Sequence, residues 1–266
     1  MTARSRRSLL HQSVLRTKIA SRTLTLGSWI TLGHPGIAEI MANAGLEWIV
    51  VDLEHSMIDL EQAAELIRTI DLCGVAPLVR LTSNDPDQIK RVMDAGAHGI
   101  VVPMVNSAAD AVRAVAATRY APQGTRGVGL ARAQGYGTRF KEYLAWQADG
   151  PVVMVQIEHR DGVAHLEEIL AVRGVDGFVI GPYDLSCSMG IPGQFEREDF
   201  LSAMQSILAT AKRLQRPAGI HLVEPDLNRL AHAVRQGYTF IAYSVDFRIL
   251  DVGLRQAVQR VKEQGT

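Results

Sequence analysis

The sequence predicts a single (β/α)8 TIM barrel in the α/β class, and three observations support this fold. Eight short apolar runs recur along the chain, segments with helical periodicity separate most of them, and the length of 266 residues suits such a barrel. A doubly wound open sheet is the competing arrangement. It is disfavoured because no GxGxxG turn follows the first run and because the repeat is nearly uniform.

The eight runs are apolar almost without alternation, as expected for strands buried on both faces of a parallel sheet. They occupy residues 24–30, 48–53, 76–81, 99–104, 151–158, 177–182, 217–223 and 239–246. We expect each run to form one barrel strand.

Helix signals lie between these runs. DLEQAAELIRTIDL follows the second run and DPDQIKRVMDAG the third, where Pro86 suits a helix start and Gly96 a helix end. The final segment, FRILDVGLRQAVQRVKEQ, has the pattern of an amphipathic helix.

Residues 119–150, between the fourth predicted helix and the fifth strand, are too long for a simple connection. Their ends belong at the amino-terminal side of the barrel, but their path stays open: they could wrap over a neighbour or form an extra helical excursion. We divide the chain into a basic amino-terminal segment, residues 1–22, and the barrel domain, residues 23–266.

Composition excludes several classes of function. The chain has 28 basic and 28 acidic side chains and no obvious basic stripe, so we expect no nucleic-acid partner. No apolar run of signal-peptide or membrane-spanning length is visible. Two cysteines, Cys73 and Cys187, are too few for a disulfide framework and fit a reducing compartment. We therefore expect a soluble, cytoplasmic protein without a membrane partner.

Polar side chains follow several predicted strands where those strands end. Because the active face of a barrel lies at the carboxyl-terminal ends of its strands, these side chains should converge on one mouth. They are Asp52, Glu54 and His55 at the end of the second run, Arg80 at the end of the third, Gln156 and Glu158 at the end of the fifth, Tyr183 and Asp184 after the sixth, and His221 and Glu224 at the end of the seventh.

Each candidate has a functional and a structural interpretation. Glu158 and Asp184 are hard oxygen ligands suited to Mg²⁺ or Mn²⁺, which take further ligands from water and substrate, but one of them could instead pair with Arg80. Arg80 could clamp a developing enolate or be a plain ion-pair partner. Asp52 is three residues from His55, close enough to orient that imidazole as a general base, although a lone histidine is usually structural.

Two further observations narrow the chemistry. The five lysines, Lys18, Lys90, Lys141, Lys212 and Lys262, all lie away from predicted strand ends, which argues against a Schiff-base aldolase. Gly181 and Pro182 precede Tyr183, and this segment could open a helix whose N–H groups hold an anion, or it could be an ordinary turn.

The strings IVVDLEHS, LVRLTSNDPDQIKRVMDAGAHGIVVPMV, RYAPQGTRGVG, VQIEHRDGV and VIGPYDLSCSMG together resemble the HpcH/HpaI aldolase family of the phosphoenolpyruvate/pyruvate barrel superfamily. The resemblance runs from about Gly27 to Asp246. It implies a metal-dependent class II pyruvate aldolase, which makes or breaks a C–C bond between pyruvate enolate and an aldehyde and uses Mg²⁺, Mn²⁺ or Co²⁺.

The resemblance also implies roles for individual residues. Glu158 and Asp184 match the metal ligands, and Arg80 matches the arginine that holds the keto oxygen. His55 with Asp52 matches the base dyad. The remaining matches are Glu54, which would act through water on the metal, Gln156 beside the ligands, the backbone of Gly181, Pro182, Tyr183 and Asp184 for the pyruvate carboxylate, and the peripheral Trp29 and Arg126.

Some positions depart from well-known degradative members of the family. Those members carry a small residue where this chain has Tyr183, a glycine where it has Leu53, and an aliphatic residue near the position of His221. The identity of the aldehyde substrate is therefore left undefined. Alternatives are a relative that cleaves an acyl-CoA substrate, an oxaloacetate decarboxylase, and a catalytically silent barrel. The resemblance also implies a homo-oligomer, commonly a hexamer built as a trimer of dimers, with the carboxyl-terminal helix exchanged or packed on its own barrel.

Overall fold

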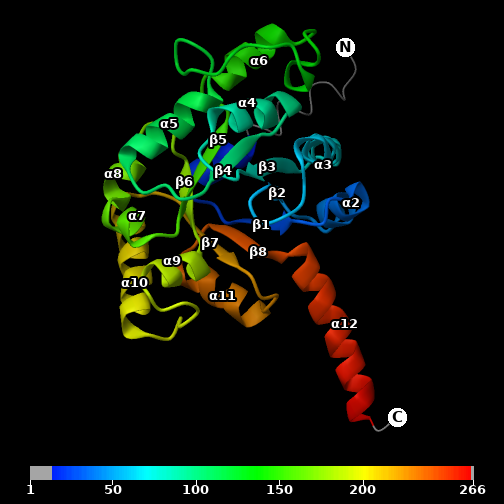
Figure 1. Cartoon of the computed structure of the whole chain (residues 1–266), viewed down its shortest axis with the longest axis vertical. Helices are drawn as coiled ribbons and strands as arrows, with labels where there is room; N and C mark the ends of the chain where they lie inside the picture. Colours follow the sequence, from blue (N-terminus) through cyan, green and yellow to red (C-terminus); the bar gives the residue numbers. More distant parts are fainter. Residues whose placement is uncertain (1–13, 265–266) are drawn as a thin grey trace.

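In the computed structural model, which describes residues 14–264, eight parallel strands close into a barrel in sequence order (Figure 1). The strands are β1 (Thr25–Ile30), β2 (Trp48–Asp52), β3 (Ala76–Arg80), β4 (Gly99–Val102), β5 (Val152–Ile157), β6 (Gly177–Ile180), β7 (Ala218–Leu222) and β8 (Phe240–Val245). Each lies within its predicted run, so the predicted barrel is confirmed.

Helices follow the strands and cover the outside of the barrel. They are α2 (Pro35–Asn43), α3 (Leu60–Leu72), α4 (Pro86–Ala95), α5 (Ala108–Thr118), α6 (Phe140–Gln147), α7 (Arg160–Ala164), α8 (Leu166–Ala171), α9 (Pro182–Ser188), α10 (Glu198–Arg213), α11 (Leu227–Gln236) and α12 (Asp246–Glu263), with a 3₁₀ turn, η1 (Arg132–Gln134). The predicted start of α4 at Pro86 and its end before Gly96 are confirmed.

Side chains along each strand alternate between the two hydrophobic layers. Val79, Val153 and Ile241 belong to the outer layer that packs under the helices, whereas Leu78 and Met154 belong to the layer inside the barrel. This alternation is the period of two that any strand imposes.

The same period decides what reaches the mouth. In β3, the inward series begins with Ala76 and Leu78, both in the inner layer, and its next member is Arg80. In β5, Gln156 follows the inward Met154 in the same way. The top layer of the barrel is therefore polar although the strands themselves are apolar.

A short helical segment closes the amino-terminal end of the barrel. Residues 14–20 are helical, and Leu15 and Ile19 are buried in the inner layer with Trp48 and Phe240, whose rings stack at 4.0 Å. Glycine at position 27 makes room for the Trp48 ring in this layer, because a Cβ there would lie 2.1 Å from that ring. The part of the predicted basic segment that precedes residue 14 lies outside the described residues.

The long connection before β5 forms an extra helical excursion, one of the two paths left open by the sequence. It contains η1 and α6 and lies beside α4 at the amino-terminal side of the barrel (Figure 1). Arg132 of this excursion binds Asp71 at the end of α3, and Asp71 also contacts His98 before β4. Ion pairs thus fasten the excursion to the barrel.

Helix α12 leaves the end of β8 and extends away from the barrel (Figure 1). Its only buried residue among those described is Asp246, whose carboxylate accepts hydrogen bonds from the backbone N–H groups of Thr31 (2.9 Å) and Leu32 (2.7 Å). Within residues 14–264, no helix combines the length and apolar character needed to span a bilayer.

Candidate functional site

A pocket of about 340 Å³ opens at the carboxyl-terminal mouth of the barrel. It is lined by Trp29, His55, Arg80, Gln156, Val179, Ile180, Gly181, Pro182, Tyr183, Asp184, His221 and Val223. Side chains from β1, β3, β5 and β7 and from the loops after β2 and β6 therefore meet, as the convergence of polar strand ends predicts.

Arg80 is the central cation of this mouth. Its guanidinium donates two hydrogen bonds to the Asp52 carboxylate, at 2.8 and 2.7 Å, and lies 3.1 Å from Glu54. Asp52 and Arg80 are register partners in β2 and β3, so the sheet itself sets this pair. The guanidinium also lies 4.3 Å from the centre of the Trp29 ring, a cation–π contact that holds it in place.

Glu158 lies just past the end of β5 and is almost fully buried. One oxygen accepts the backbone N–H of Met104 at 2.7 Å, and the other makes a close contact with the Gln156 amide. A Cβ at Gly181 would lie 2.9 Å from the Glu158 carboxylate and 3.1 Å from Gln156. Glycine at this position therefore preserves the space in front of both side chains.

Negative charge accumulates around Glu158. Burial raises the pKa of Glu158 to about 7, with further increases from the charges of Glu54 and Asp184 and an opposing effect of the Met104 N–H. Burial also raises the pKa of Glu54 to about 7, with Arg80 opposing and Asp52 and Asp184 adding to the increase. Arg80 thus does not neutralise this cluster of carboxylates.

These residues fit a hard divalent cation. The Gln156 Oε1 atom is buried and has no hydrogen-bond partner among the described residues, so an acceptor beside Glu158 is left unsatisfied. No group of three or more His, Cys, Asp or Glu side chains within residues 14–264 is arranged to hold a metal. A site with Glu158 and Asp184 as its only charged ligands requires oxygens from water or substrate, which is usual for Mg²⁺.

Neither predicted ligand is used in a structural ion pair with Arg80. Among the described residues, the ion pairs of Arg80 are with Asp52 and Glu54. The alternative in which Glu158 or Asp184 pairs with Arg80 is therefore wrong.

The predicted contact between Asp52 and the His55 ring is also wrong. Both Asp52 oxygens bind Arg80, and Asp52 meets His55 only through the backbone N–H of that residue, at 3.4 Å. The pairing fails because the register of β2 and β3 places a permanent cation within reach of Asp52. His55 itself is exposed and lines the pocket.

Helix α9 begins at the pocket with Pro182, as the Gly-Pro pair suggests. Tyr183 and Asp184 lie in its first turn, where backbone N–H groups have no partner within the helix. The Tyr183 ring is half exposed and packs edge-on against Phe195 at 4.9 Å. The outer rim of the pocket is therefore aromatic.

Arg126, a peripheral match in the resemblance, lies away from the mouth. It is buried against Tyr120 and donates hydrogen bonds to the Tyr143 hydroxyl (2.8 Å) and to Asp94 (2.5 Å). Asp94 lies in the last turn of α4, at the amino-terminal side of the barrel. Arg126 instead holds the excursion in place.

Two residues of the mouth were not assigned from the sequence. Met104, whose N–H binds Glu158, has a left-handed backbone (φ +54°) that no sequence pattern announces. His221 lines the pocket, stacks on Trp29 at 5.0 Å, and contacts the Ser244 carbonyl through Nε2 at 3.1 Å. Burial lowers the pKa of His221 to about 4, which favours the neutral ring, and Nε2 carries its proton because the Ser244 carbonyl can only accept a hydrogen bond. Its place at the end of β7 was the available signal.

Comparison with known proteins gives consistent matches over most of the chain. A profile of the HpcH/HpaI aldolase/citrate lyase family matches residues 25–250. A pyruvate aldolase of Rhizobium etli is 37% identical over 90% of this chain and 93% of its own length. A 5-keto-4-deoxy-D-glucarate aldolase of Salmonella arizonae is 34% identical over 93% of this chain and 96% of its own.

Solved structures agree with the sequence matches. An HpcH/HpaI aldolase/citrate lyase family protein from Burkholderia cenocepacia superposes with a TM-score of 0.89 at 32% identity, covering 94% of this chain and 99% of that one. Sequence and structural similarity thus both extend over most of this chain.

Proposed function

The chain belongs to the HpcH/HpaI aldolase/citrate lyase family and is a carbon–carbon lyase, and we propose that it is a divalent-metal-dependent pyruvate aldolase acting on a 4-hydroxy-2-oxoacid. The observation that carries the proposal is the pairing of one fixed cation, Arg80, with an undercompensated carboxylate cluster across a pocket of about 340 Å³. A 2-oxoacid would bring oxygens to both.

In this proposal Glu158 and Asp184 hold the metal, with Gln156 beside them. A bound Mg²⁺, Mn²⁺ or Co²⁺ would act as a Lewis acid that favours enolate formation. Burial makes the charged carboxylates costly, and a cation removes that cost because it neutralises them. The electrostatics of the site therefore favour binding of a cation over binding of a neutral ligand.

Arg80 would hold the keto oxygen of the substrate and stabilise the negative charge that develops there when the C–C bond breaks. The Asp52 carboxylate and the Trp29 ring fix the guanidinium, so its N–H groups are oriented before substrate binds. Free N–H groups in the first turn of α9, at Tyr183 and Asp184, would bind the carboxylate.

His55 would take the proton from the 4-hydroxyl group on cleavage and return it on condensation. The bond between C3 and C4 breaks, its electron pair passes to the pyruvate half as the enolate, and the hydroxyl-bearing carbon leaves as the aldehyde. His55 acts without the Asp52 carboxylate, which binds Arg80. Glu54, with a pKa near 7, would assist by exchanging protons with water in the site.

The test is pyruvate release from a panel of 4-hydroxy-2-oxoacids, coupled to lactate dehydrogenase, with EDTA and with Mn²⁺ or Mg²⁺ restored. We expect metal-dependent release that falls at least 1,000-fold in Glu158→Gln and Asp184→Asn, each about 4 kcal/mol of barrier. The matched control is Asp87→Asn, a surface carboxylate on α4, which should retain full activity.

The opposite outcome is also informative. No release from any panel member by a protein that binds Mn²⁺ would contradict the aldolase proposal. It would favour the acyl-CoA, oxaloacetate-decarboxylase or silent-barrel alternatives, which direct assays for thioester cleavage and decarboxylation separate.

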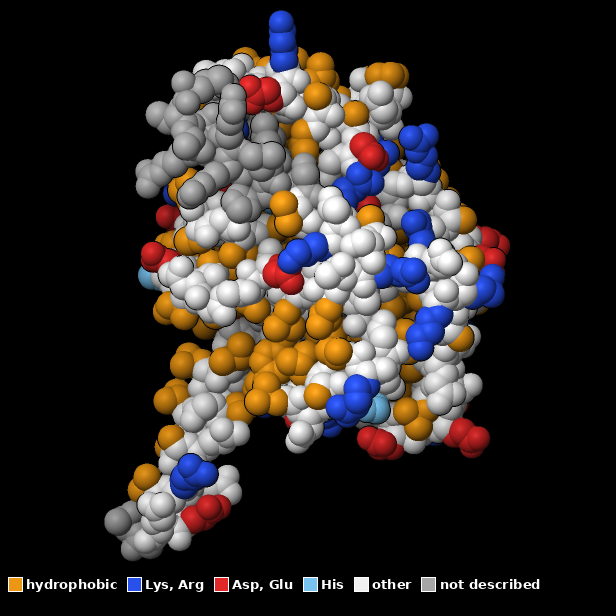
Figure 2. All heavy atoms as spheres, turned by 180° about the vertical axis from the view of Figure 1, so that it is seen from behind, with side chains coloured by type: hydrophobic (Ala, Val, Ile, Leu, Met, Phe, Trp, Pro, Cys, Tyr) orange, Lys and Arg blue, Asp and Glu red, His pale blue; other side chains and the backbone are white. Residues whose placement is uncertain are grey.

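We also propose a homo-oligomer, a hexamer built as a trimer of dimers, in which α12 packs against a neighbouring copy. Hydrophobic side chains that are roughly half exposed recur along this helix and gather on the adjoining surface (Figure 2). On α12 they are Phe247, Ile249, Leu250, Leu254, Val258 and Val261. Such a continuous stripe on an extended helix is costly in water.

Light scattering after size-exclusion chromatography tests the oligomer. Leu254→Lys should yield smaller particles than the parent chain, whereas Arg255→Lys, which keeps the charge of an exposed residue on the same helix, should not. A monomeric parent would contradict the proposal.

We further propose a cytoplasmic location, because Cys73 and Cys187 are free and exposed, as suits a reducing compartment.

A further inference from the structure

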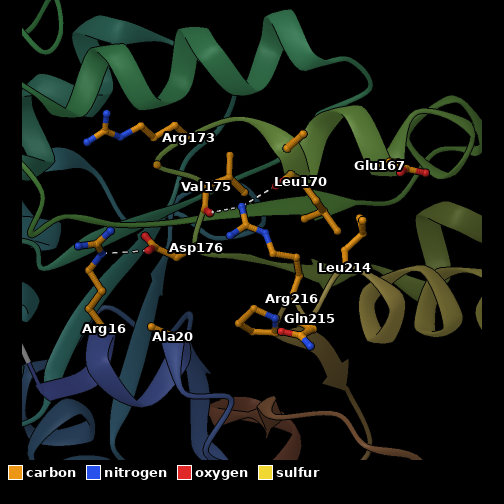
Figure 3. Close-up of a pocket in the computed structure, with 13 residues that line it drawn as sticks. Arg16, Ala20, Glu167, Leu170, Arg173, Val175, Asp176, Leu214, Gln215 and Arg216 are labelled. Carbon is orange, nitrogen blue, oxygen red and sulfur yellow. Dashed lines mark hydrogen bonds and ion pairs between the residues drawn. The ribbon is translucent and has the colours of Figure 1, made fainter.

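Two adjoining pockets lie at the amino-terminal side of the barrel, opposite the mouth. The first, of about 550 Å³, lies between the helical residues 14–20, the loop before β6 and the loop before β7 (Figure 3). The second, of about 500 Å³, lies between α5 and the turn before β5. Arg173 lines both, and we call the combined space, with Arg16, Arg119, Arg173 and Arg216 in its walls, the arginine pocket.

Only one of the four arginines has close carboxylate partners among the described residues. Arg16 lies 2.9 Å from both Asp149 and Asp176. Arg216 instead donates to two backbone carbonyl oxygens, those of Leu170 (2.5 Å) and Val175 (2.9 Å), as Figure 3 shows. Carbonyl oxygens satisfy hydrogen bonds but carry no net charge.

Arg119 is the least satisfied of the four. The residue is 6% exposed, and its Nε and Nη2 atoms are buried without a hydrogen-bond partner in the described part of the chain. The nearest ion-pair contact is with Asp149 at 3.8 Å, beyond hydrogen-bonding distance, and Asp149 already binds Arg16. Burial lowers the pKa of Arg119, which reflects this lack of compensation.

The charges of the pocket do not balance within residues 14–264. Arg173 is exposed and has no ion pair there, and Glu167 at the rim is paired with Arg213 outside the pocket. Four guanidinium groups thus face two carboxylates, Asp149 and Asp176. A buried guanidinium without a counter-charge is costly, and oxyanions match its planar fork of donors.

We propose that the arginine pocket binds a small polyanion that carries two or more phosphate or carboxylate groups. The excess of positive charge selects an anion with at least two charges. The volume admits a small metabolite, and Leu170, Val175 and Leu214 line one wall as an apolar contact for its carbon skeleton. This site is separate from the mouth and does not depend on the proposed aldolase activity.

The pocket also adjoins the strands that carry the proposed metal ligands. Asp149 stands three residues before β5, which leads to Glu158, and Asp176 directly precedes β6, which leads to Asp184. Asp176 accepts the N–H of Val153 in β5 at 2.9 Å, so this carboxylate bridges the two strands. An anion bound in the arginine pocket would contact the amino-terminal ends of both β5 and β6.

Isothermal titration calorimetry on the full, metal-free chain at fixed ionic strength tests the site. The probes are inorganic pyrophosphate and propane-1,2,3-tricarboxylate, which separate phosphate from carboxylate ligands. We expect one saturable site per chain for at least one probe, and a Kd at least tenfold higher in Arg173→Ala. Arg173 is exposed, so its loss should leave the fold intact.

Two controls assign the binding to this pocket. Arg235→Ala removes an exposed arginine from α11 and should leave the Kd unchanged. Arg80→Gln removes the cation of the mouth and should also leave the Kd unchanged. Absence of saturable binding, an equal loss in Arg235→Ala, or a loss in Arg80→Gln with binding retained in Arg173→Ala would each overturn the proposal.

Discussion

The Glu54–Glu158 cluster at the mouth of the barrel and Asp71 at its amino-terminal end differ in how far neighbouring cations offset the burial of a carboxylate. At the mouth, Glu54 and Glu158 have pKa values raised to about 7, because burial and neighbouring carboxylates outweigh the one cation. At the amino-terminal end, Asp71 lies between His98 and Arg132, which hold its pKa at about 2 despite burial. Glu54 and Glu158 are therefore costly to ionise until a cation binds beside them. The charge of Asp71 is already neutralised by residues of the folded chain.

This difference separates a site from a scaffold. Buried carboxylates that are paired with cations of the same chain stabilise the fold. Buried carboxylates without enough cationic partners destabilise it, and a cationic ligand that neutralises them gains that free energy on binding.

Replacing Arg80 by lysine should reduce kcat/KM about 1,000-fold, roughly 4 kcal/mol. Lysine keeps the charge but loses the fork that binds Asp52 through two N–H groups and stacks on Trp29. Steady-state pyruvate release measures the effect. Arg91→Lys, an exposed change on α4, is the control, and similar activity in both variants would contradict the role of Arg80 geometry.

Adding one methyl group at Gly181 should reduce activity about 100-fold, or 2.7 kcal/mol. The Cβ of Gly181→Ala would lie 2.9 Å from the Glu158 carboxylate and would displace it. The unfolding temperature should change little, since the pocket is open on its other side. Gly129→Ala is the matched control, because the nearest atom to its Cβ would be 4.0 Å away.

Asp71→Asn should lower the free energy of unfolding by about 2 kcal/mol at pH 7 while leaving kcat unchanged. The folded pKa of Asp71 is depressed, so its stabilisation is present above the unfolded value of 3.8 and is lost as the pH falls toward about 2. Urea unfolding between pH 7 and pH 2.5 should therefore show the gap between variant and parent closing. A gap independent of pH would point to packing instead.

Glu158→Gln should raise the free energy of unfolding of the metal-free protein by roughly 1–2 kcal/mol at pH 8. The folded pKa is raised, so the stability that the protonated group contributes is full below the unfolded value of 4.5 and is lost as the pH rises through about 7. The advantage of the variant should vanish at pH 4.5. Added Mn²⁺ should stabilise the parent and not the variant, and a variant less stable at pH 8 would contradict the comparison.

Most of the fold was predictable because its signals are local. Each strand lies within a predicted apolar run, since burial on both faces requires nearly continuous apolar residues. Pro86 begins α4 and Gly96 ends it, and both do so because of their backbone conformation alone. The path of residues 119–150 stayed open because Arg126 and Arg132 are fixed by partners far along the chain, Asp94 and Asp71.

The site was predictable in its membership but not in its pairings. Strand-end position brought Arg80, Gln156 and Asp184 into one pocket. The supposed partnership of Asp52 with His55 rested on closeness in sequence, and the strand register gave Asp52 to Arg80 instead. His221 carried the right positional signal without a role attached to it.

By itself, the sequence determined the eight-fold repeat of strands and helices and the residue types that stand at the strand ends, because period and polarity are local properties of the chain. Only the tertiary structure decided which charges meet. It gave Asp52 to Arg80, left Glu54 and Glu158 undercompensated, and left Arg119 buried without a close counter-charge. Electrostatic energy depends on the distance between charges and on their burial, and both are set by the folded structure rather than by position in the sequence.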